Sequence, residues 1–481
     1  MSNIKKNFIY ISVYNFLLML LPIVTSPILS RRLGAELLGI YNYVDAIVSI
    51  FLVFASTGIY RYGMREIAKY KENKDLMSQK YINIVLVNIL NVFFVISIYF
   101  LFVIYMVDET NRMYFWIKLV TLLTVIFDNA FLYYGLENIK ILTLRDGLTK
   151  IVAFVCIVIF IKSSEDIYLY FIIMSICPFI SAFWGFIYSR RFIKFKIPEL
   201  KECKKLYKPL IILMIPSLSY IIYQSMDKVM INTFYNASEV GYYACASKVL
   251  VLRTIITSLG TAICPHLVSL YSKGNIEIAN KKFVDSLLIS LIIAIFSLAN
   301  IIAISKEFAP IFWGSSFSVC SNLMIGFAIS IPIWCISEVI RTQYLLPHGR
   351  DNQYMLSFII GLIINAISNV LLIPIWGAIG AILSIILSEL MMSFIQAWFI
   401  RKEVCIKYSI YKCIPYVIIA LISILIVRGF VLLQLNITII TLILEILVSI
   451  ISFSILVCFY EYITNKKIIL NIIFNKMKKT L

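Results

Sequence analysis

Long apolar runs, separated by short polar segments, repeat along the whole chain. The first is FIYISVYNFLLMLLPIVTSPIL at 8–29, and similar runs follow as far as 436–463. A helix needs about 20 residues to cross a hydrocarbon core about 30 Å thick, so each run predicts a transmembrane helix and not a barrel strand. The first run is too long for the core of a signal peptide and lacks a small-residue cleavage site after it, so we expect it to be retained.

The polar residues that flank each run divide the chain into fourteen predicted helices. Their ranges are 8–29, 39–62, 81–107, 115–136, 141–161, 167–189, 209–233, 241–266, 283–304, 317–341, 352–375, 376–400, 411–431 and 436–463. Two pairs of consecutive predicted helices are separated by very short segments, one pair by PIWG at 374–377 and the other by Glu137-Asn138. The predicted fold class is therefore an all-α integral membrane protein with about fourteen transmembrane helices.

Composition and charge agree with this prediction. Hydrophobic residues make up 61% of the chain and charged residues 14%, which excludes a soluble protein with a solvated surface. Basic residues concentrate in alternate segments, with eight in 189–208, five in 63–80 and five after Ile463. Since Lys and Arg mark cytoplasmic loops, both termini are expected to be cytoplasmic. The net charge of +18 reflects this topology and attraction to anionic lipid headgroups, and it requires no nucleic acid.

Cysteine and histidine give no sign of a metal centre or a cofactor. The ten cysteines lack a metal-ligand spacing, and the chain has only two histidines. We interpret the cysteines as small packing residues.

An internal repeat relates two parts of the sequence. At an offset of 202 residues, the segment from Gly39 aligns with the segment from Gly241, and the matches include Gly58 with Gly260 and Lys80 with Lys282. The repeats are six predicted helices apart, so both have the same orientation and describe a parallel repeat about an axis along the membrane normal. The repeat predicts two six-helix bundles, 1–200 and 201–405, with two extra helices and a basic tail in 406–481.

Charged residues within predicted helices are the candidates for contact with a substrate, because each is costly in a membrane and tends to face a watery interior. Arg253 lies close to the midplane of its helix, and Lys248 lies nearer its outer end. Both are candidates for binding an anionic headgroup, since guanidinium and ammonium groups bind phosphate oxygens. A structural ion pair with Glu389 or another acid is the alternative.

Other charges within the predicted helices have two interpretations each. Lys150 is a further candidate for anion binding, but it lies at a depth similar to that of Asp128, and a structural pair between these two is the favoured alternative. Asp45, Asp128 and Glu389 are acids at depth and therefore candidates for ion coupling or gating.

The adjacent charges Asp227-Lys228 lie nearer the outer rim than the midplane of their helix. Neighbours in sequence point about 100° apart on a helix, so each needs its own partner. For Asp227 we expect a structural or gating tie, and Lys228 is a fourth candidate for contact with an anionic headgroup.

Four segments together resemble a known family. They are 27–69 (beginning PILSRRLGAELLGIYNYVDAIVSI), 215–249 (beginning IPSLSYIIYQSMDKVMIN), LLPHGR at 345–350 and NVLLIPIWGAIGAILSIILSE at 369–389. In this order and spacing they are similar to the polysaccharide flippases of bacterial surface-polysaccharide synthesis. Those proteins belong to the superfamily of multidrug, oligosaccharidyl-lipid and polysaccharide exporters, and the resemblance covers most of the chain through residue 400.

The resemblance implies a V-shaped, alternating-access transporter in the bacterial cytoplasmic membrane. Its substrate would be an oligosaccharide linked to undecaprenyl pyrophosphate, moved from the cytoplasmic to the outer leaflet, with membrane lipids around it and a polymerase and glycosyltransferases as partners. The resemblance supplies no set of site residues, so these rest on the charges above.

Three alternatives follow from the same residues. A drug or cation exporter of the same superfamily would share the repeat and the fold, but it would favour acids over bases in its cleft. A lipid II flippase is a closer relative, and the sequence alone distinguishes poorly between it and a polysaccharide flippase. A membrane-bound glycan polymerase or ligase is disfavoured, because the predicted outer loops are no longer than about a dozen residues and an enzyme of this kind needs a larger acidic or metal-binding loop. No P-loop pattern for nucleotide hydrolysis is present.

Overall fold

The computed structural model describes residues 2–432 and 439–464, and all of the elements within those ranges are helices. The chain divides into two compact units, Met1–Gly241 and Tyr242–Leu481. The sequence repeat predicts a bundle boundary at residue 200, and this boundary stays a prediction. The division into compact units instead places the helix that follows residue 200 in the first unit. The predicted basic tail falls largely on 465–481, outside the described residues.

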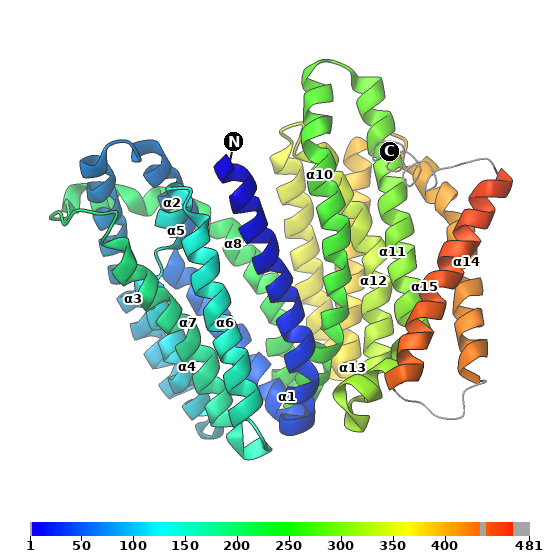
Figure 1. Ribbon diagram of the computed structural model, residues 1–481, viewed down its shortest axis with the longest axis horizontal. Coiled ribbons are helices and arrows are strands. Elements are labelled where there is room, and N and C mark those ends of the chain that lie inside the picture. The colour runs from blue at the N-terminus through cyan, green and yellow to red at the C-terminus, as the bar shows by residue number, and fades with distance from the viewer. Residues whose placement is uncertain (1, 433–438, 465–481) are drawn as a thin grey trace. The chain divides into compact units, whose positions relative to one another are not determined.

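The first unit is a bundle of long helices (Figure 1). Helix α6 packs against α1 and α7, and α4 packs against α7 and α1. The elements are α1 (Ser2–Ser56), α2 (Ile59–Tyr70), α3 (Lys74–Met106), α4 (Glu109–Phe127), α5 (Ala130–Gly135), α6 (Ile139–Phe160), the 3₁₀ turn η1 (Ser164–Asp166), α7 (Ile167–Ser189), α8 (Leu200–Phe234) and the beginning of α9 (Ala237–Ala246). A buried apolar cluster that includes Ile67, Ile84, Phe131 and Leu210 joins α2, α3, α5 and α8.

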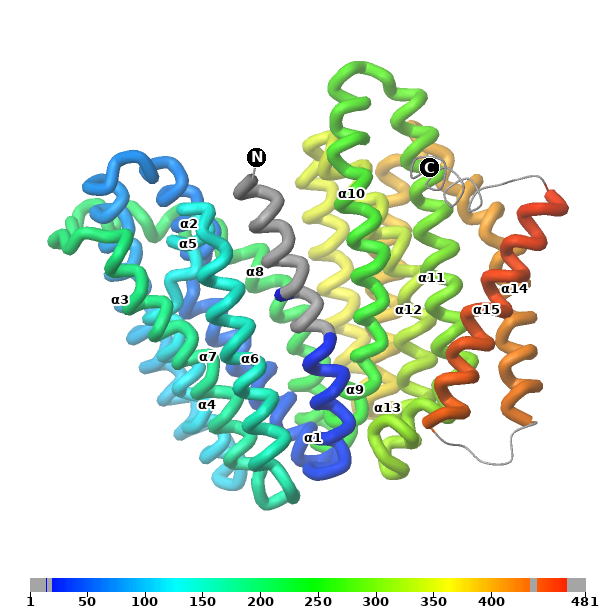
Figure 2. Tube along the Cα trace, in the orientation of Figure 1, coloured from blue at the N-terminus to red at the C-terminus, as the bar shows by residue number. Residues whose placement is uncertain are grey.

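The second unit is arranged around α11, which packs against α12, α14 and α15 (Figure 2). After α9 come the 3₁₀ turn η2 (Ser247–Leu252), α10 (Arg253–Ser272), α11 (Ile276–Trp313), η3 (Ser315–Phe317), α12 (Cys320–Ile340), the π-helical turn η4 (Arg341–Leu345), α13 (Asp351–Ile400), α14 (Ile406–Leu432) and α15 (Ile439–Thr464). Helix α11 buries Phe283 and Trp313 almost completely. Its apolar character on all sides is typical of a helix surrounded by others.

Within the described ranges, eleven helices are long and apolar enough to cross a membrane, so the chain is a multi-pass membrane protein. Two of these contain a residue with non-helical backbone angles, Gly34 in α1 (φ 77°) and Gly377 in α13 (φ 53°). Positive φ favours glycine, and both kinks fall where the sequence predicts a junction between two helices. Helix α6 is not among the eleven, and the predicted number of fourteen is not confirmed.

Two predicted helices are interrupted, contrary to the prediction. The helix predicted for 39–62 breaks at Thr57-Gly58, where both residues have positive φ (39° and 67°). The helix predicted for 115–136 breaks at Asp128-Asn129, because Asp128 is extended and its carboxylate accepts the backbone N–H of Ala130 at 3.1 Å. A short polar side chain competes here with the helical hydrogen bonds, which periodicity alone does not reveal.

The helix predicted for 241–266 is also not continuous. It consists of α9, the tighter 3₁₀ turn η2 and α10, which continues to Ser272. Arg253 is the first residue after the 3₁₀ turn, so its direction differs from the one an ideal helix would give.

A reciprocal contact between α1 and α9 involves the repeat-related glycines. A Cβ atom on Gly39 would lie 1.6 Å from the carbonyl oxygen of Ala237, and one on Gly241 would lie 2.0 Å from that of Ala35. Ala35 and Ala237 are separated by the same offset as Gly39 and Gly241. All four residues belong to the first unit, where this contact fixes the beginning of α9 against α1.

Candidate functional site

A charged pocket lies within the first unit, between α1, α4, α6 and α7. Its volume is about 390 Å³, within the range of small-molecule sites. The polar part of its wall carries two bases and two acids, together with hydroxyl groups from Tyr14, Thr124, Thr149 and Ser181. Apolar residues of α6 and α7, including Pro178, complete it. Four ionisable groups around one pocket inside apolar helices mark it as the candidate functional site.

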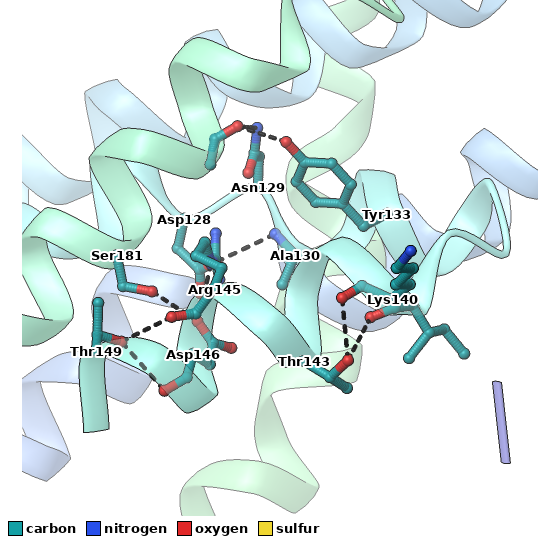
Figure 3. A network of polar contacts seen from close by, with 12 residues as sticks. Asp128, Asn129, Ala130, Tyr133, Lys140, Thr143, Arg145, Asp146, Thr149 and Ser181 are labelled. Carbon is teal, nitrogen blue, oxygen red and sulfur yellow. Dashed lines mark hydrogen bonds and ion pairs between the residues drawn. The ribbon is translucent and has the colours of Figure 1, made fainter. Parts of the chain in front are cut away.

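Arg145 and Asp146 form the fixed part of this site (Figure 3). Arg145 Nε donates to Asp146 Oδ1 at 2.8 Å, and Ser181 Oγ of α7 donates to the same oxygen at 2.7 Å. Arg145 is 8% exposed and packs its guanidinium against Gly185, where a Cβ atom would lie 2.1 Å from Nη1. That Nη1 is buried and has no hydrogen-bond acceptor among the described residues. This nitrogen therefore faces the Gly185 backbone of α7 and is not open to the pocket.

Lys150 lies one turn beyond Asp146 on α6 and is the second base of the pocket. Its ammonium lies 5.5 Å from the centroid of the Tyr14 ring, a cation–π arrangement. Within the described part of the chain no carboxylate lies within ion-pair distance of it, so the structural pair expected between Asp128 and Lys150 does not form. The two residues share the pocket without contact.

Asp128 closes one side of the pocket at the α4–α5 break. Its carboxylate accepts from Ala130 N, as described above, and forms no ion pair with a described residue. Next to it, Asn129 Nδ2 and Tyr133 Oη both donate to the carbonyl oxygen of Gly185, at 3.3 and 2.5 Å. These bonds fix the interrupted segment against α7, as Figure 3 shows.

Asp45 and Lys228 belong to a second charged group of the first unit. Lys118 of α4, 3% exposed, donates to Asp45 Oδ1 at 2.7 Å and to Tyr41 Oη at 3.3 Å. Asp45 and Asp227 are the acids that act electrostatically on Lys228, although no described carboxylate lies within 4 Å of its ammonium. Asp227 itself is 2% exposed. The structure thus brings three of the predicted residues together and adds Lys118, which the sequence interpretation did not include.

Arg253 and Glu389 pair directly in the second unit. Arg253 Nη1 and Nη2 donate to Glu389 Oε1 and Oε2 at 2.8 and 3.2 Å, Nη2 also donates to Ser330 Oγ, and the guanidinium lies 5.0 Å from the Trp334 ring centroid. Glu389 is 1% exposed. The structure thus favours the alternative that the sequence left open for Arg253, an ion pair with Glu389. Lys248 lies on η2, is exposed and takes no part in the Arg253–Glu389 ion pair.

The sequence interpretation missed Arg145 and Asp146, and a signal was available. They are adjacent opposite charges in an apolar helix, as Asp227-Lys228 are, and they lie five and four residues before Lys150, which was already a candidate. Residues four apart lie on the same helix face, so the spacing of Asp146 and Lys150 already predicts that their side chains lie close together.

Fold and site together define a multi-pass, all-helical membrane protein with a charged pocket enclosed in one helical unit. The profile of the polysaccharide biosynthesis protein family matches residues 4–271, more than half of the chain, and the chain belongs to this family.

Two curated relatives are similar in sequence. One is the "Probable low-salt glycan biosynthesis flippase Agl15" of Haloferax volcanii, 24% identical over 227 residues, which are 47% of this chain and 48% of the relative. The other is the "Putative O-antigen transporter" of Escherichia coli K12, 28% identical over 168 residues, which are 34% of this chain and 40% of the relative. The chain thus matches less than half of the length of either relative.

Two solved structures share the fold. The lipid II flippase MurJ in an inward closed conformation has a TM-score of 0.71 at 15% identity, over 95% of this chain and 99% of that one. An inward-facing multidrug resistance transporter of the MATE family in the MOP superfamily has a TM-score of 0.60 at 13% identity, over 81% of this chain and 94% of that one. At these identities the likeness concerns the fold.

Proposed function

We propose that this protein is a flippase for a lipid-linked oligosaccharide, carried on undecaprenyl pyrophosphate, for the synthesis of a surface polysaccharide. It moves the substrate from the cytoplasmic to the outer leaflet of the bacterial cytoplasmic membrane by alternating access, with both termini cytoplasmic and without catalysing a reaction. Family membership and the two relatives, a probable glycan biosynthesis flippase and a putative O-antigen transporter, support this proposal.

The observation that carries the proposal is the pair of bases in the pocket of the first unit. Lys150 has no carboxylate partner among the described residues, and Arg145 has a buried Nη1 without an acceptor. A pyrophosphate oxygen supplies the acceptor that Lys150 lacks, and charge-assisted hydrogen bonds of this kind are the strong ones. The hydroxyl groups of Tyr14, Thr149 and Ser181 offer further contacts to a polar headgroup.

Lys228, Lys248 and Arg253 are weaker candidates for the headgroup. Lys228 lies beside two acids, and Arg253 is held by Glu389. Asp45, Asp128, Asp227 and Glu389 remain candidates for ion coupling or gating. We further propose that the polymerase and glycosyltransferases of the pathway act on the same lipid-linked substrate as separate proteins.

Replacement of Lys150 tests this function. Lys150→Ala should lower surface polysaccharide in a flippase-deficient strain at least about tenfold, because a hydrogen bond to a charged group contributes about 1.5–3 kcal/mol. Lys150→Arg should retain most of the activity. Lys162→Ala is the control, since Lys162 is exposed and only its backbone N–H bonds Asp166. Full surface polysaccharide with Lys150→Ala, at an equal amount of protein in the membrane, would remove the pocket from the mechanism.

A drug or cation exporter is the second candidate, and one observation favours it. Asp128 and Asp146 line the same pocket as the two bases, and Asp128 has no ion pair with a described residue. If this candidate is right, expression in an efflux-deficient strain raises resistance to a cationic dye, and Asp128→Asn removes that resistance. The flippase proposal expects no such resistance.

A further inference from the structure

Asp128 connects the pocket described above with a second, smaller one. The smaller pocket has a volume of about 40 Å³ and is lined by residues at the two helix breaks, among them Ser56, Ile59 and Tyr60. Asp128 lines both pockets and is exposed, although it lies within the helical bundle. A ligand in the larger pocket can therefore place a substituent in the smaller one, beside Asp128.

Asp128 selects the part of a ligand that carries hydrogen-bond donors. One carboxylate oxygen accepts the N–H of Ala130 at 3.1 Å, and the side chain forms no ion pair with a described residue. An ionised carboxylate only accepts hydrogen bonds, and a pyrophosphate offers it negative charge and no donor, so the two groups repel each other. A sugar offers hydroxyl or amide donors, which form charge-assisted hydrogen bonds with a carboxylate. The pyrophosphate should therefore lie towards Lys150 and the sugar towards Asp128.

Tyrosine rings flank this position. Tyr60 lines the smaller pocket and is 44% exposed, so much of its ring is free to contact a ligand. Tyr134, half-buried, packs edge to face against it, with 5.4 Å between the ring centroids. Tyr14 lines the larger pocket beside Lys150. An aromatic ring with a hydroxyl group offers both an apolar surface and a polar tip, which suits the apolar face and the hydroxyl groups of a sugar ring.

The wall of the smaller pocket combines polar and apolar side chains. Ser56 and Asp128 are polar, and Ile59, Val125 and Phe131 are apolar. A volume of about 10–15 Å³ holds one water-sized particle, so about 40 Å³ holds a group of roughly three or four non-hydrogen atoms. An acetamido group has this size, and it carries an N–H donor for the carboxylate and a methyl group for the apolar wall. A hydroxyl group would leave most of the pocket empty.

We propose that Tyr60, Asp128 and the smaller pocket form a sugar subsite, which binds the sugar next to the pyrophosphate and selects one with an acetamido substituent. The sugar ring packs against Tyr60, the N–H of the acetamido group donates to Asp128, and its methyl group fills the smaller pocket. The larger pocket, about 390 Å³, is at the lower end of the range of small-molecule sites, so it holds one sugar with its phosphate and not a whole oligosaccharide. This inference rests on the proposed function, because it takes the substrate to be a lipid-linked sugar.

Binding of three lipids to the purified protein in detergent tests the subsite. The probes are undecaprenyl pyrophosphate, the same lipid carrying glucose, and the same lipid carrying N-acetylglucosamine. We expect the N-acetylglucosamine lipid to bind at least about tenfold more tightly than the glucose lipid, because it alone places an amide donor at the carboxylate and a methyl group in the smaller pocket.

Three variants separate the sugar from the headgroup. Asp128→Asn keeps an acceptor for Ala130 N but removes the negative charge, so it should weaken binding of the N-acetylglucosamine lipid and strengthen binding of undecaprenyl pyrophosphate. Tyr60→Ala should weaken both sugar lipids about tenfold, and more than undecaprenyl pyrophosphate, whereas Tyr60→Phe keeps the ring and most of the affinity. Ser56→Leu fills the smaller pocket and should abolish the difference between the two sugar lipids.

Tyr105→Ala is the matched control, because Tyr105 is 77% exposed near the end of α3 and lines neither of the two pockets. It should bind all three lipids as the unchanged protein does, and unfolding temperatures show that each variant is folded. Equal affinity for the two sugar lipids, or sugar binding unchanged in both Asp128→Asn and Tyr60→Ala, would overturn the subsite. If undecaprenyl pyrophosphate then still binds and Lys150→Ala abolishes its binding, the flippase proposal stands without the subsite. Failure of all three lipids to bind would refute both.

Discussion

Replacing Arg253 by methionine should remove the ion pair of Glu389 in the interior of the second unit. The guanidinium now bonds both oxygens of this side chain at 2.8 and 3.2 Å, and Glu389 is 1% exposed. Removing one partner of a buried ion pair costs about 3–5 kcal/mol, because the remaining charge stays out of water. We therefore expect Arg253→Met to lower the free energy of unfolding by about this amount.

The double variant Arg253→Met, Glu389→Met separates stability from function. Apolar replacement of a whole buried pair is often neutral or stabilising, so the double variant should recover most of the loss. The assay is unfolding of the detergent-solubilised protein by sodium dodecyl sulphate, which gives the free energy of unfolding for a double-mutant cycle.

Arg350→Met serves as the control for this cycle. Arg350 pairs with Glu403 at 2.7 and 2.8 Å, but their side chains are 28% and 38% exposed. Exposed pairs contribute about 0–1 kcal/mol, so the loss should be small. A loss below about 1 kcal/mol for Arg253→Met, or no recovery in the double variant, would refute the reasoning. Surface polysaccharide in the double variant then tests for a role beyond the ion pair, because a folded but inactive double variant would mean that Arg253 or Glu389 acts in transport.

Three further outcomes are expected. Hydrogen bonds from Arg350 lower the pKa of Glu403 below its usual value of 4.5. Their contribution to stability is therefore present above pH 4.5 and is lost as the pH falls through the lowered pKa. In Glu403→Gln the unfolding temperature should depend less on pH between about pH 5 and pH 3, and an unchanged fall of the unfolding temperature in acid would contradict this. Gly39→Val should reduce the amount of folded protein in the membrane, because its Cβ atom would collide with the backbone of Ala237. Gly429→Val is the control and should not reduce it, because no atom lies within 4 Å of the Cβ position there. Equal amounts of the two variants in the membrane would disprove the close contact at Gly39. Glu445 is 0% exposed and neither oxygen has a partner among the described residues, so Glu445→Met should raise stability by about 1–3 kcal/mol, and a lower unfolding temperature would count against this account.

Apolar periodicity located the helices because the membrane demands long apolar segments wherever the chain crosses it. It did not locate the breaks at Thr57-Gly58 and Asp128-Asn129, since apolar residues continue on both sides of each. The break at Asp128 depends on one side chain that bonds its own backbone, and the choice between that bond and a continued helix is local.

Charges were found from the sequence, but their partners were only partly found. Arg253 and Glu389 are 136 residues apart, and their contact depends on how α10 and α13 are rotated about their axes, which the 3₁₀ turn before Arg253 changes. For the same reason Asp128 and Lys150, which lie at similar depth, share a pocket without forming a pair. Depth along a helix follows from counting residues, whereas direction around it requires the neighbouring helices.

The contact of Gly39 with Ala237 and of Gly241 with Ala35 constrains how this sequence can change. A larger residue at Gly39 meets the backbone of Ala237, and a larger residue at Gly241 meets the backbone of Ala35. Neither glycine can therefore gain a side chain unless α1 and α9 move apart, so the two positions limit each other although they are 202 residues apart in the sequence.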